Sequence, residues 1–148
     1  MSGATIWHGG VTPEVAALTE LGDQSMPGHI GIEFVEVGPD FMRARMPVDR
    51  RTHQPFGRLH GGASVALAET VGSVAAASTI DPARFAAVGM EINANHVRPA
   101  RDGWVFATVR AENLGRTTQI WSIRIEDEAG KLVCISRLTV AVIEIDRK

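Results

Sequence analysis

One carboxylate in this chain has almost no polar residues near it in the sequence. Glu69 is the single charge within residues 61–78, and its neighbours one helical turn away are small or apolar: Val65, Ala66, Gly72 and Ser73. Taking a carboxylate out of water is costly unless it is paired or protonated, so such a group is typical of a general base or a nucleophile. The alternative is a glutamate at a solvent-facing stripe or an oligomer contact. Because no polar stripe accompanies Glu69, we favour the catalytic interpretation.

A second feature that could take part in catalysis precedes Glu69, at the start of the same segment. His60, Gly61 and Gly62 lead directly into the apolar run. The first turn of a helix has backbone N–H groups without intrahelical partners, and glycine leaves room for a substrate oxygen to approach them. Such groups can stabilise a developing oxyanion. Equally, the two glycines could simply shape the joint between loop and helix.

The spacing between these two features bears on how they could act together. Gly61 and Glu69 are eight residues apart, which is roughly 12 Å along one helix. A nucleophile and an oxyanion donor must both lie about 3 Å from the reacting group. If both act on one substrate, they therefore come from different subunits, and a two-fold homodimer has two identical shared sites.

The elements around this segment predict an α+β fold. A helix-start pattern at Thr12, Pro13 and Glu14 predicts a short helix that ends near Leu21, with Gly22 as its stop. Residues 61–78 predict a long helix, apolar on every side and therefore buried on every side. Strand-like patterns cover residues 31–37, 41–48, 86–97, 104–112, 118–126 and 131–145. We expect a curved antiparallel sheet of five or six strands wrapped around one long buried helix.

Size and composition narrow the possibilities further. The chain of 148 residues predicts a single domain over residues 1–148, with 1–24 as an N-terminal segment that carries the short helix. The net charge is −2 without a long basic run, which argues against a nucleic-acid partner. No signal peptide or membrane span is expected, so the default location is cytoplasmic. We interpret Cys134, the single cysteine, as a small core residue, and no spacing indicates a metal site.

The stretch QPFGRLHGGASVALAE, residues 54–69, resembles the hotdog-fold thioesterases. Within them it is similar to the thioesterases of 1,4-dihydroxy-2-naphthoyl-CoA and their enterobactin-pathway paralogues. Further similar segments are MPVD at 46–49, EINANHVR at 91–98 and SRLT at 136–139. The resemblance therefore spans nearly the whole chain.

This resemblance implies roles for individual residues. Glu69 matches the nucleophile or general base and Gly61 the backbone oxyanion donor. Gln54 and His60 match residues that position the thioester and water, and Ser73 matches a residue near the reacting group. Pantetheine and nucleotide are expected near Gly89, His96, Val97, Arg98, Pro99, Asn113, Leu114, Gly115, Arg116, Thr117 and Thr118. Arg98 and Arg116 are the natural phosphate partners among them.

The resemblance also implies the reaction. We expect hydrolysis of an aromatic acyl-CoA, such as 1,4-dihydroxy-2-naphthoyl-CoA or a hydroxybenzoyl-CoA, without a cofactor, in a homodimer that pairs into a homotetramer. Coenzyme A is then part of the substrate. Two alternatives stay open: a module that binds or proofreads acyl-CoA or acyl-carrier protein with little turnover, and a dehydratase. The apolar setting of Glu69 argues against a mere binder, and this helix lacks a His-plus-acid arrangement.

Overall fold

The computed structural model describes residues 4–146. The outermost ends of the predicted domain, 1–3 and 147–148, lie outside the described residues. The helical elements are η1 (His8–Gly10), α1 (Val15–Gly22), α2 (Met26–His29) and α3 (Gly61–Ser78). The strands are β1 (Glu33–Val37), β2 (Phe41–Pro47), β3 (Phe85–His96), β4 (Trp104–Leu114), β5 (Thr118–Asp127) and β6 (Leu132–Glu144). All but η1 and α2 match segments predicted from sequence periodicity.

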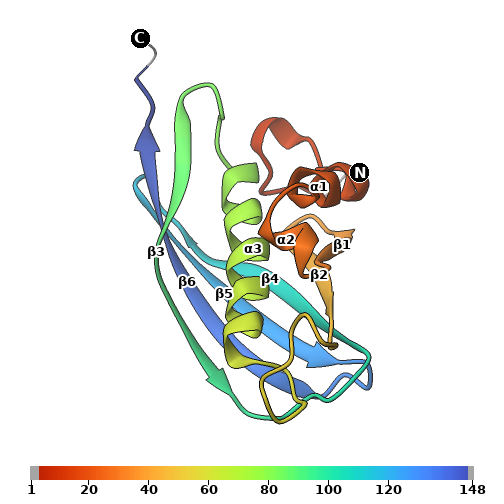
Figure 1. The fold of residues 1–148 in the computed structure, drawn as a ribbon. Helices are drawn as coiled ribbons and strands as arrows, with labels where there is room; N and C mark the ends of the chain where they lie inside the picture. Colours follow the sequence, from red (N-terminus) through yellow and green to blue (C-terminus); the bar gives the residue numbers. More distant parts are fainter. Residues whose placement is uncertain (1–3, 147–148) are drawn as a thin grey trace.

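The six strands form one antiparallel sheet in the order β1-β2-β4-β5-β6-β3. The sheet curves, and α3 lies across its concave face (Figure 1). The alternation of side chains along each strand explains why one face of the sheet packs against α3. In β4, Val105, Ala107 and Val109 are fully buried beneath the helix, whereas the residues between them point to the other face. The prediction of a curved antiparallel sheet around one long helix is confirmed.

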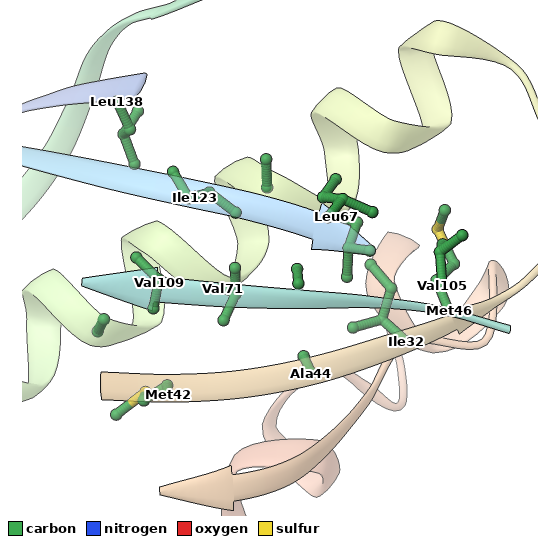
Figure 2. Packing of buried hydrophobic residues seen from close by; sticks show 14 of the residues in the cluster. Ile32, Met42, Ala44, Met46, Leu67, Val71, Val105, Val109, Ile123 and Leu138 are labelled. Carbon is green, nitrogen blue, oxygen red and sulfur yellow. The ribbon is translucent and has the colours of Figure 1, made fainter. Parts of the chain in front are cut away.

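Small and branched apolar side chains fill the space between helix and sheet. Leu67 and Val71 of α3 meet Val109, Ile123 and Leu138 from three successive strands (Figure 2). All five are completely buried. Burial of such side chains typically contributes about 1.5–3 kcal/mol each, so this contact holds α3 in a defined position on the sheet.

One expectation for α3 is wrong for a single chain. The helix is buried only on the face that meets the sheet, where its buried residues are Ser64, Leu67, Ala68, Val71, Gly72, Ala75 and Ala76. The opposite face, which carries Val65, Glu69 and Ser73, is half-buried and lines a groove. An almost uncharged helix therefore leaves an apolar strip uncovered in one protomer. Glu69 is half-buried on that strip rather than enclosed.

The N-terminal segment folds over one end of α3 (Figure 1). Helix α1 begins at Val15 rather than at the predicted Thr12–Glu14 start, and Glu14 occupies the N-cap without a side-chain hydrogen bond. Trp7 is buried and its Nε1 donates to the carbonyl oxygen of Gly38 at 2.8 Å, which anchors the segment to the β1–β2 turn. This anchoring places α1 and α2 beside the open face of α3.

Candidate active site

The first turn of α3 has one free donor. The N–H of Gly62 bonds to Nδ1 of His60 at 2.8 Å, and the N–H groups of Ala63 and Ser64 bond to the His60 carbonyl at 3.0 and 3.2 Å. Within residues 4–146, the N–H of Gly61 has no hydrogen-bond partner. Of the orphan donors that a helix start normally presents, this one is left to interact with a ligand, with the positive end of the helix dipole behind it.

His60 is the N-cap of α3, with extended φ and ψ of −70° and 132°. Because its Nδ1 accepts the Gly62 N–H, a neutral His60 carries its proton on Nε2. The residue is exposed, so this Nε2–H can donate to a bound group. Capping therefore leaves the second ring nitrogen of His60 available to a ligand.

Gly61 lines a cavity of about 390 Å³ at the start of α3. Its polar lining includes Gln54, Arg58, His96 and Arg98. A Cβ at position 61 would lie 2.9 Å from Nε2 of His96, so glycine permits the imidazole to lie close to the helix start. The side-chain oxygen of Gln54 accepts the backbone N–H of Phe56, which leaves the Gln54 amide NH₂ as a donor.

Glu69 lies two turns further along α3, in a second hollow that follows the open face of the helix from Gly62 to Val74. A groove of about 530 Å³ is lined by Glu69 and Ser73 together with Met26, Val65 and Val74 among others. Among residues 4–146, the Glu69 carboxylate has neither an ion pair nor a hydrogen-bond donor. Its Oε1 packs so closely against Gly89 of β3 that a Cβ at position 89 would lie 2.6 Å away. The carboxylate is thus positioned by packing and open to a ligand.

The predicted catalytic residues therefore form two half-sites within one chain. Gln54 and Gly61 line the cavity at the helix start, with His60 as the exposed cap beside it, whereas Glu69 and Ser73 line the groove on the open face. The structure brings the members of each half together and keeps the halves apart. This separation agrees with the roughly 12 Å expected along the helix axis.

The residues predicted to bind coenzyme A also divide into two groups. His96, Val97, Arg98 and Pro99 line the same cavity as Gly61. The β4–β5 turn, Asn113 to Thr118, lies across the sheet, where Leu114 pairs with Gln119, Gln119 with Val140, and Val140 with Gly89. This row crosses the sheet beside the Glu69 carboxylate, away from the His96 end of β3. Within this row Gly89 lies against the carboxylate, whereas the β4–β5 turn is two to three strands further across the sheet. Of the two predicted binding segments, the one from His96 to Pro99 shares a hollow with a predicted catalytic residue.

Two polar lining residues of the Gly61 cavity have no role in the sequence-based prediction. Arg58 brings a second guanidinium to the cavity beside Arg98, and the buried Ser64 belongs to its wall. The signal for Arg58 lies in the motif itself, since a cation three residues before a glycine-rich helix start is suited to an anion. Ser64 offers no such signal, because serines are common in first helical turns.

The remaining titratable groups of note have structural explanations. Burial raises the pKa of the Cys134 thiol, which lies in the core as predicted. A side-chain hydrogen bond from Arg51 lowers the pKa of Asp49 in the loop after β2. No cluster of three or more His, Cys, Asp or Glu within residues 4–146 could hold a metal ion. In the same residues, no helix is long and apolar enough to cross a membrane.

Known proteins resemble this chain in sequence and in fold. The family model described as Thioesterase superfamily matches residues 56–134. The 1,4-dihydroxy-2-naphthoyl-CoA hydrolase of Escherichia coli is 49% identical over 138 residues, covering 93% of this chain and 99% of that protein. A proofreading thioesterase of Cronobacter turicensis is 47% identical over 137 residues, covering 93% and 98%. The crystal structure of a mutant thioesterase from Pseudomonas aeruginosa superposes with a TM-score of 0.93 at 45% identity, covering 95% and 100%.

Proposed function

The chain belongs to the thioesterase superfamily and is a thioester hydrolase with the hotdog fold, and from that premise we propose how it works and on what. The substrate is an aromatic acyl-coenzyme A, hydrolysed to the free acid and coenzyme A. Glu69 is the catalytic carboxylate, and the N–H of Gly61 is the oxyanion donor. The two groups come from different subunits of a homodimer.

The unpartnered N–H of Gly61 is the observation that carries this proposal. His60 satisfies the next three N–H groups of the turn, so the N–H of Gly61 is the one backbone donor of this turn that is left for a ligand. The Gln54 amide lines the same cavity and supplies a second donor toward a carbonyl oxygen. Such preorganised donors are worth about 10²–10³ in kcat each in hydrolases.

The division into half-sites supports a shared active site. Glu69 and Gly61 line separate hollows of one chain, yet hydrolysis needs both within about 3 Å of the thioester group. A two-fold axis that sets two α3 helices antiparallel brings the Glu69 groove of one protomer to the Gly61 cavity of its partner. It also covers the apolar strip of α3 that a single chain leaves open.

The chemistry then follows from these groups. The thioester carbonyl oxygen accepts from Gly61 and Gln54 and gains negative charge during attack. Glu69 can attack the carbonyl carbon to give a mixed anhydride, which water then hydrolyses to the free acid and the regenerated carboxylate. In the other route Glu69 deprotonates the water that attacks the carbonyl carbon and afterwards gives that proton to the departing thiolate or to solvent. The C–S bond breaks and coenzyme A leaves as a thiolate, which needs little acid assistance because a thiol has a pKa near 8.5. One carboxylate and one oxyanion site are therefore sufficient.

Positively charged side chains bind the coenzyme A portion and take no part in the reaction itself. Arg58 and Arg98 give the Gly61 cavity two cations, and Arg116 lies on the exposed β4–β5 turn. Guanidinium groups suit phosphate oxygens. The aromatic acyl group is supported by the relative named for 1,4-dihydroxy-2-naphthoyl-CoA, which is 49% identical. Pairing of dimers into a homotetramer is part of the same proposal.

Incubation of the purified protein with a panel of thioesters tests the proposal. Release of free thiol from aromatic acyl-CoA, faster than from fatty acyl-CoA and from the same acyl group on a carrier protein, is the expected result. Preferential hydrolysis of the carrier-protein ester would instead favour the proofreading role for which the Cronobacter relative is named. Binding without thiol release would contradict the assigned chemistry.

A further inference from the structure

The far end of α3 is joined to the sheet by a chain of side-chain hydrogen bonds that has no part in the chemistry described above. Nε1 of Trp121 donates to Oε1 of Gln119 at 2.9 Å, and Nε2 of Gln119 donates to Oγ1 of Thr79 at 2.9 Å. The Thr79 hydroxyl in turn donates to the carbonyl oxygen of Ala76 at 2.8 Å. Trp121 and Gln119 belong to β5, whereas Thr79 is the C-cap of α3. The chain therefore connects a strand of the sheet to the end of the helix.

Each bond in this chain can run in one direction only. The indole N–H of Trp121 donates and cannot accept, so the side-chain oxygen of Gln119 must face it. The Gln119 amide then presents its NH₂ group to Thr79, whose hydroxyl accepts and directs its own proton to Ala76. Trp121 is completely buried and Gln119 is 3% exposed. A bond lost here would leave a buried polar group unpaired, which is costly, so the chain strongly favours one arrangement.

The remaining contact between α3 and the sheet is apolar. Small and branched side chains fill the interface (Figure 2), and such contacts have no preferred direction. Within residues 4–146, the bond from Gln119 to Thr79 is the one hydrogen bond that joins α3 or its C-cap to the sheet. At the other end, the backbone N–H of His60 donates to the carbonyl oxygen of Thr52 in the preceding loop. The chain thus restrains the position of α3 on the sheet in a way that apolar packing cannot.

The sheet end of the chain lies in the same cross-strand row as the contact made by Glu69. Gln119 pairs with Val140, and Val140 pairs with Gly89, against which the Glu69 carboxylate is packed. Thr79 follows Glu69 by about 15 Å along the helix axis. Two points of α3 are therefore held against one row, by a hydrogen bond at the C-cap and by packing at the carboxylate. A shift of α3 that breaks one contact also changes the other.

We propose that Gln119 and Thr79 are positioning residues for thioester hydrolysis: their hydrogen bond sets the place of α3 on the sheet and thereby holds the Glu69 carboxylate where it reacts. The proposal rests on the function proposed above, because it takes Glu69 as the catalytic carboxylate. Neither positioning residue lines the Gly61 cavity or the Glu69 groove, so each acts through the helix. Since a misplacement of about 1 Å can cost about 10² in rate, loss of the bond should appear in kcat.

Substitutions at the helix end test this proposal. Thr79→Val has nearly the same shape but removes the hydroxyl, whereas Thr79→Ser keeps it. In both variants the Ala76 carbonyl keeps the backbone N–H of residue 79 as a donor, at 3.1 Å in this structure. Ser78→Ala is the matched control, because the Ser78 hydroxyl donates to the Val74 carbonyl at 2.7 Å within the helix and does not reach the sheet.

Thr79→Val should lower kcat for an aromatic acyl-CoA at least about tenfold and change KM less than about twofold. Thr79→Ser and Ser78→Ala should change kcat and KM less than about twofold. Gln119→Met breaks the same bond from the sheet side, so it should lower kcat as Thr79→Val does, and the double variant should fall little further. Circular dichroism checks folding, and the assays are run well below the unfolding temperature of each variant.

A Glu69→Gln background separates positioning from a merely structural role. If Thr79 acts through the carboxylate, Thr79→Val should change the residual turnover of that background less than about twofold. An equal fall in both backgrounds, an unchanged kcat in folded Thr79→Val, or a rise in KM alone would overturn the positioning role and leave Glu69 catalysis intact. Near-normal turnover by Glu69→Gln alone would instead remove the proposed function. Because Thr79 is half-buried, its variants decide the question even if the buried Gln119 does not tolerate methionine.

Discussion

The carboxylate of Glu69 on α3 is packed directly against the backbone of Gly89 on β3. A Cβ at position 89 would lie 2.6 Å from Oε1 of Glu69, which is closer than real Cβ contacts allow. The strand pairing with β6 shifts register between Gly89 and Glu91, so the contact lies at a β-bulge, a feature that often re-aims a neighbouring group. Gly89, expected from the resemblance to lie along coenzyme A, thus has a geometric part in placing the carboxylate.

Gly89→Ala should therefore displace the carboxylate and lower kcat, because a misplacement of about 1 Å can cost about 10² in rate. We expect a fall of at least about tenfold with little change in KM. The same substitution should cost less in a Glu69→Asp background, where the carboxylate is already withdrawn by one methylene. Steady-state kinetics of the two single variants and the double variant measure this coupling.

Gly72→Ala provides the control for general crowding in the core. A Cβ there would lie 2.7 Å from Cδ2 of Leu138, a buried side chain beneath the same helix, and it would not meet the Glu69 carboxylate. This variant should lose stability but keep kcat. Equal kcat losses in both glycine variants would mean that Gly89 acts only through packing.

Glu69→Gln should abolish most turnover while keeping the fold, since the amide has nearly the same shape but cannot act as base or nucleophile. We expect kcat to fall at least about 10²-fold, the low end of general-base contributions. Glu36→Gln, a change at an exposed glutamate of β1, should have no effect. Circular dichroism checks folding, and near-normal kcat on an aromatic acyl-CoA would refute the assignment of Glu69.

The arginines should affect binding rather than chemistry. Arg58→Ala, Arg98→Ala and Arg116→Ala are each expected to raise KM for acyl-CoA about tenfold, as loss of a hydrogen bond to a charged group implies. A short pantetheine thioester without the nucleotide should be much less affected. Arg124→Ala is the control, because this exposed arginine lies on β5 near Glu126 and lines neither the Gly61 cavity nor the Glu69 groove. Similar KM changes for both substrates would exclude phosphate binding.

Cys134 should make stability depend on alkaline pH. Burial raises the pKa of its thiol in the folded state, whereas in the unfolded state the thiol has a pKa of about 8.5. Above that pH the unfolded chain binds fewer protons than the folded one, so stability is fully present below about pH 8.5 and falls as pH rises. Urea unfolding at pH 7 to 10 should show this fall, and Cys134→Ala should show less of it. Identical slopes would contradict the interpretation.

Local patterns were sufficient to predict most of the fold. The alternation around Val105, Ala107 and Val109 corresponds to an observed strand, and the run over α3, whose single charge is Glu69, corresponds to the observed helix. The short helix α2 was missed because its sequence, Met26 to His29, contains a proline and a glycine, which disfavour helices. Contacts with α1 and α3 stabilise it there, and such long-range packing is invisible to local propensity.

The residue types of the candidate site are predictable from the sequence, but the division of these residues between two hollows is not. A lone carboxylate and a glycine-rich helix start are visible in the sequence, and so is their separation along the helix. Which hollow each residue lines depends on strand register and on the course of the N-terminal segment. The position of Arg58, three residues before the glycine-rich helix start, suggests an anion site, but only the folded loop shows that it shares a cavity with Gly61 and Arg98.

The structure provides a well-matched pair of variants for a test of the shared site. Gly61→Pro removes the single free N–H at the first helical position, where proline is well tolerated, and the preceding His60 is already extended as proline requires. Gly61→Ala brings a similar Cβ toward His96 but keeps the N–H. Gly61→Pro should therefore lose about 10²–10³ in kcat, and Gly61→Ala much less.

Activity recovered by mixing two inactive variants tests the central claim most directly. In a heterodimer of Glu69→Gln and Gly61→Pro, a site shared between chains receives both lesions in one copy and neither in the other. Refolding the two variants together should restore activity toward half that of an unaltered dimer per heterodimer, while each variant refolded alone stays inactive. If circular dichroism shows both to be folded and heterodimers form, yet no activity returns, then Glu69 and Gly61 do not act on one substrate from different chains.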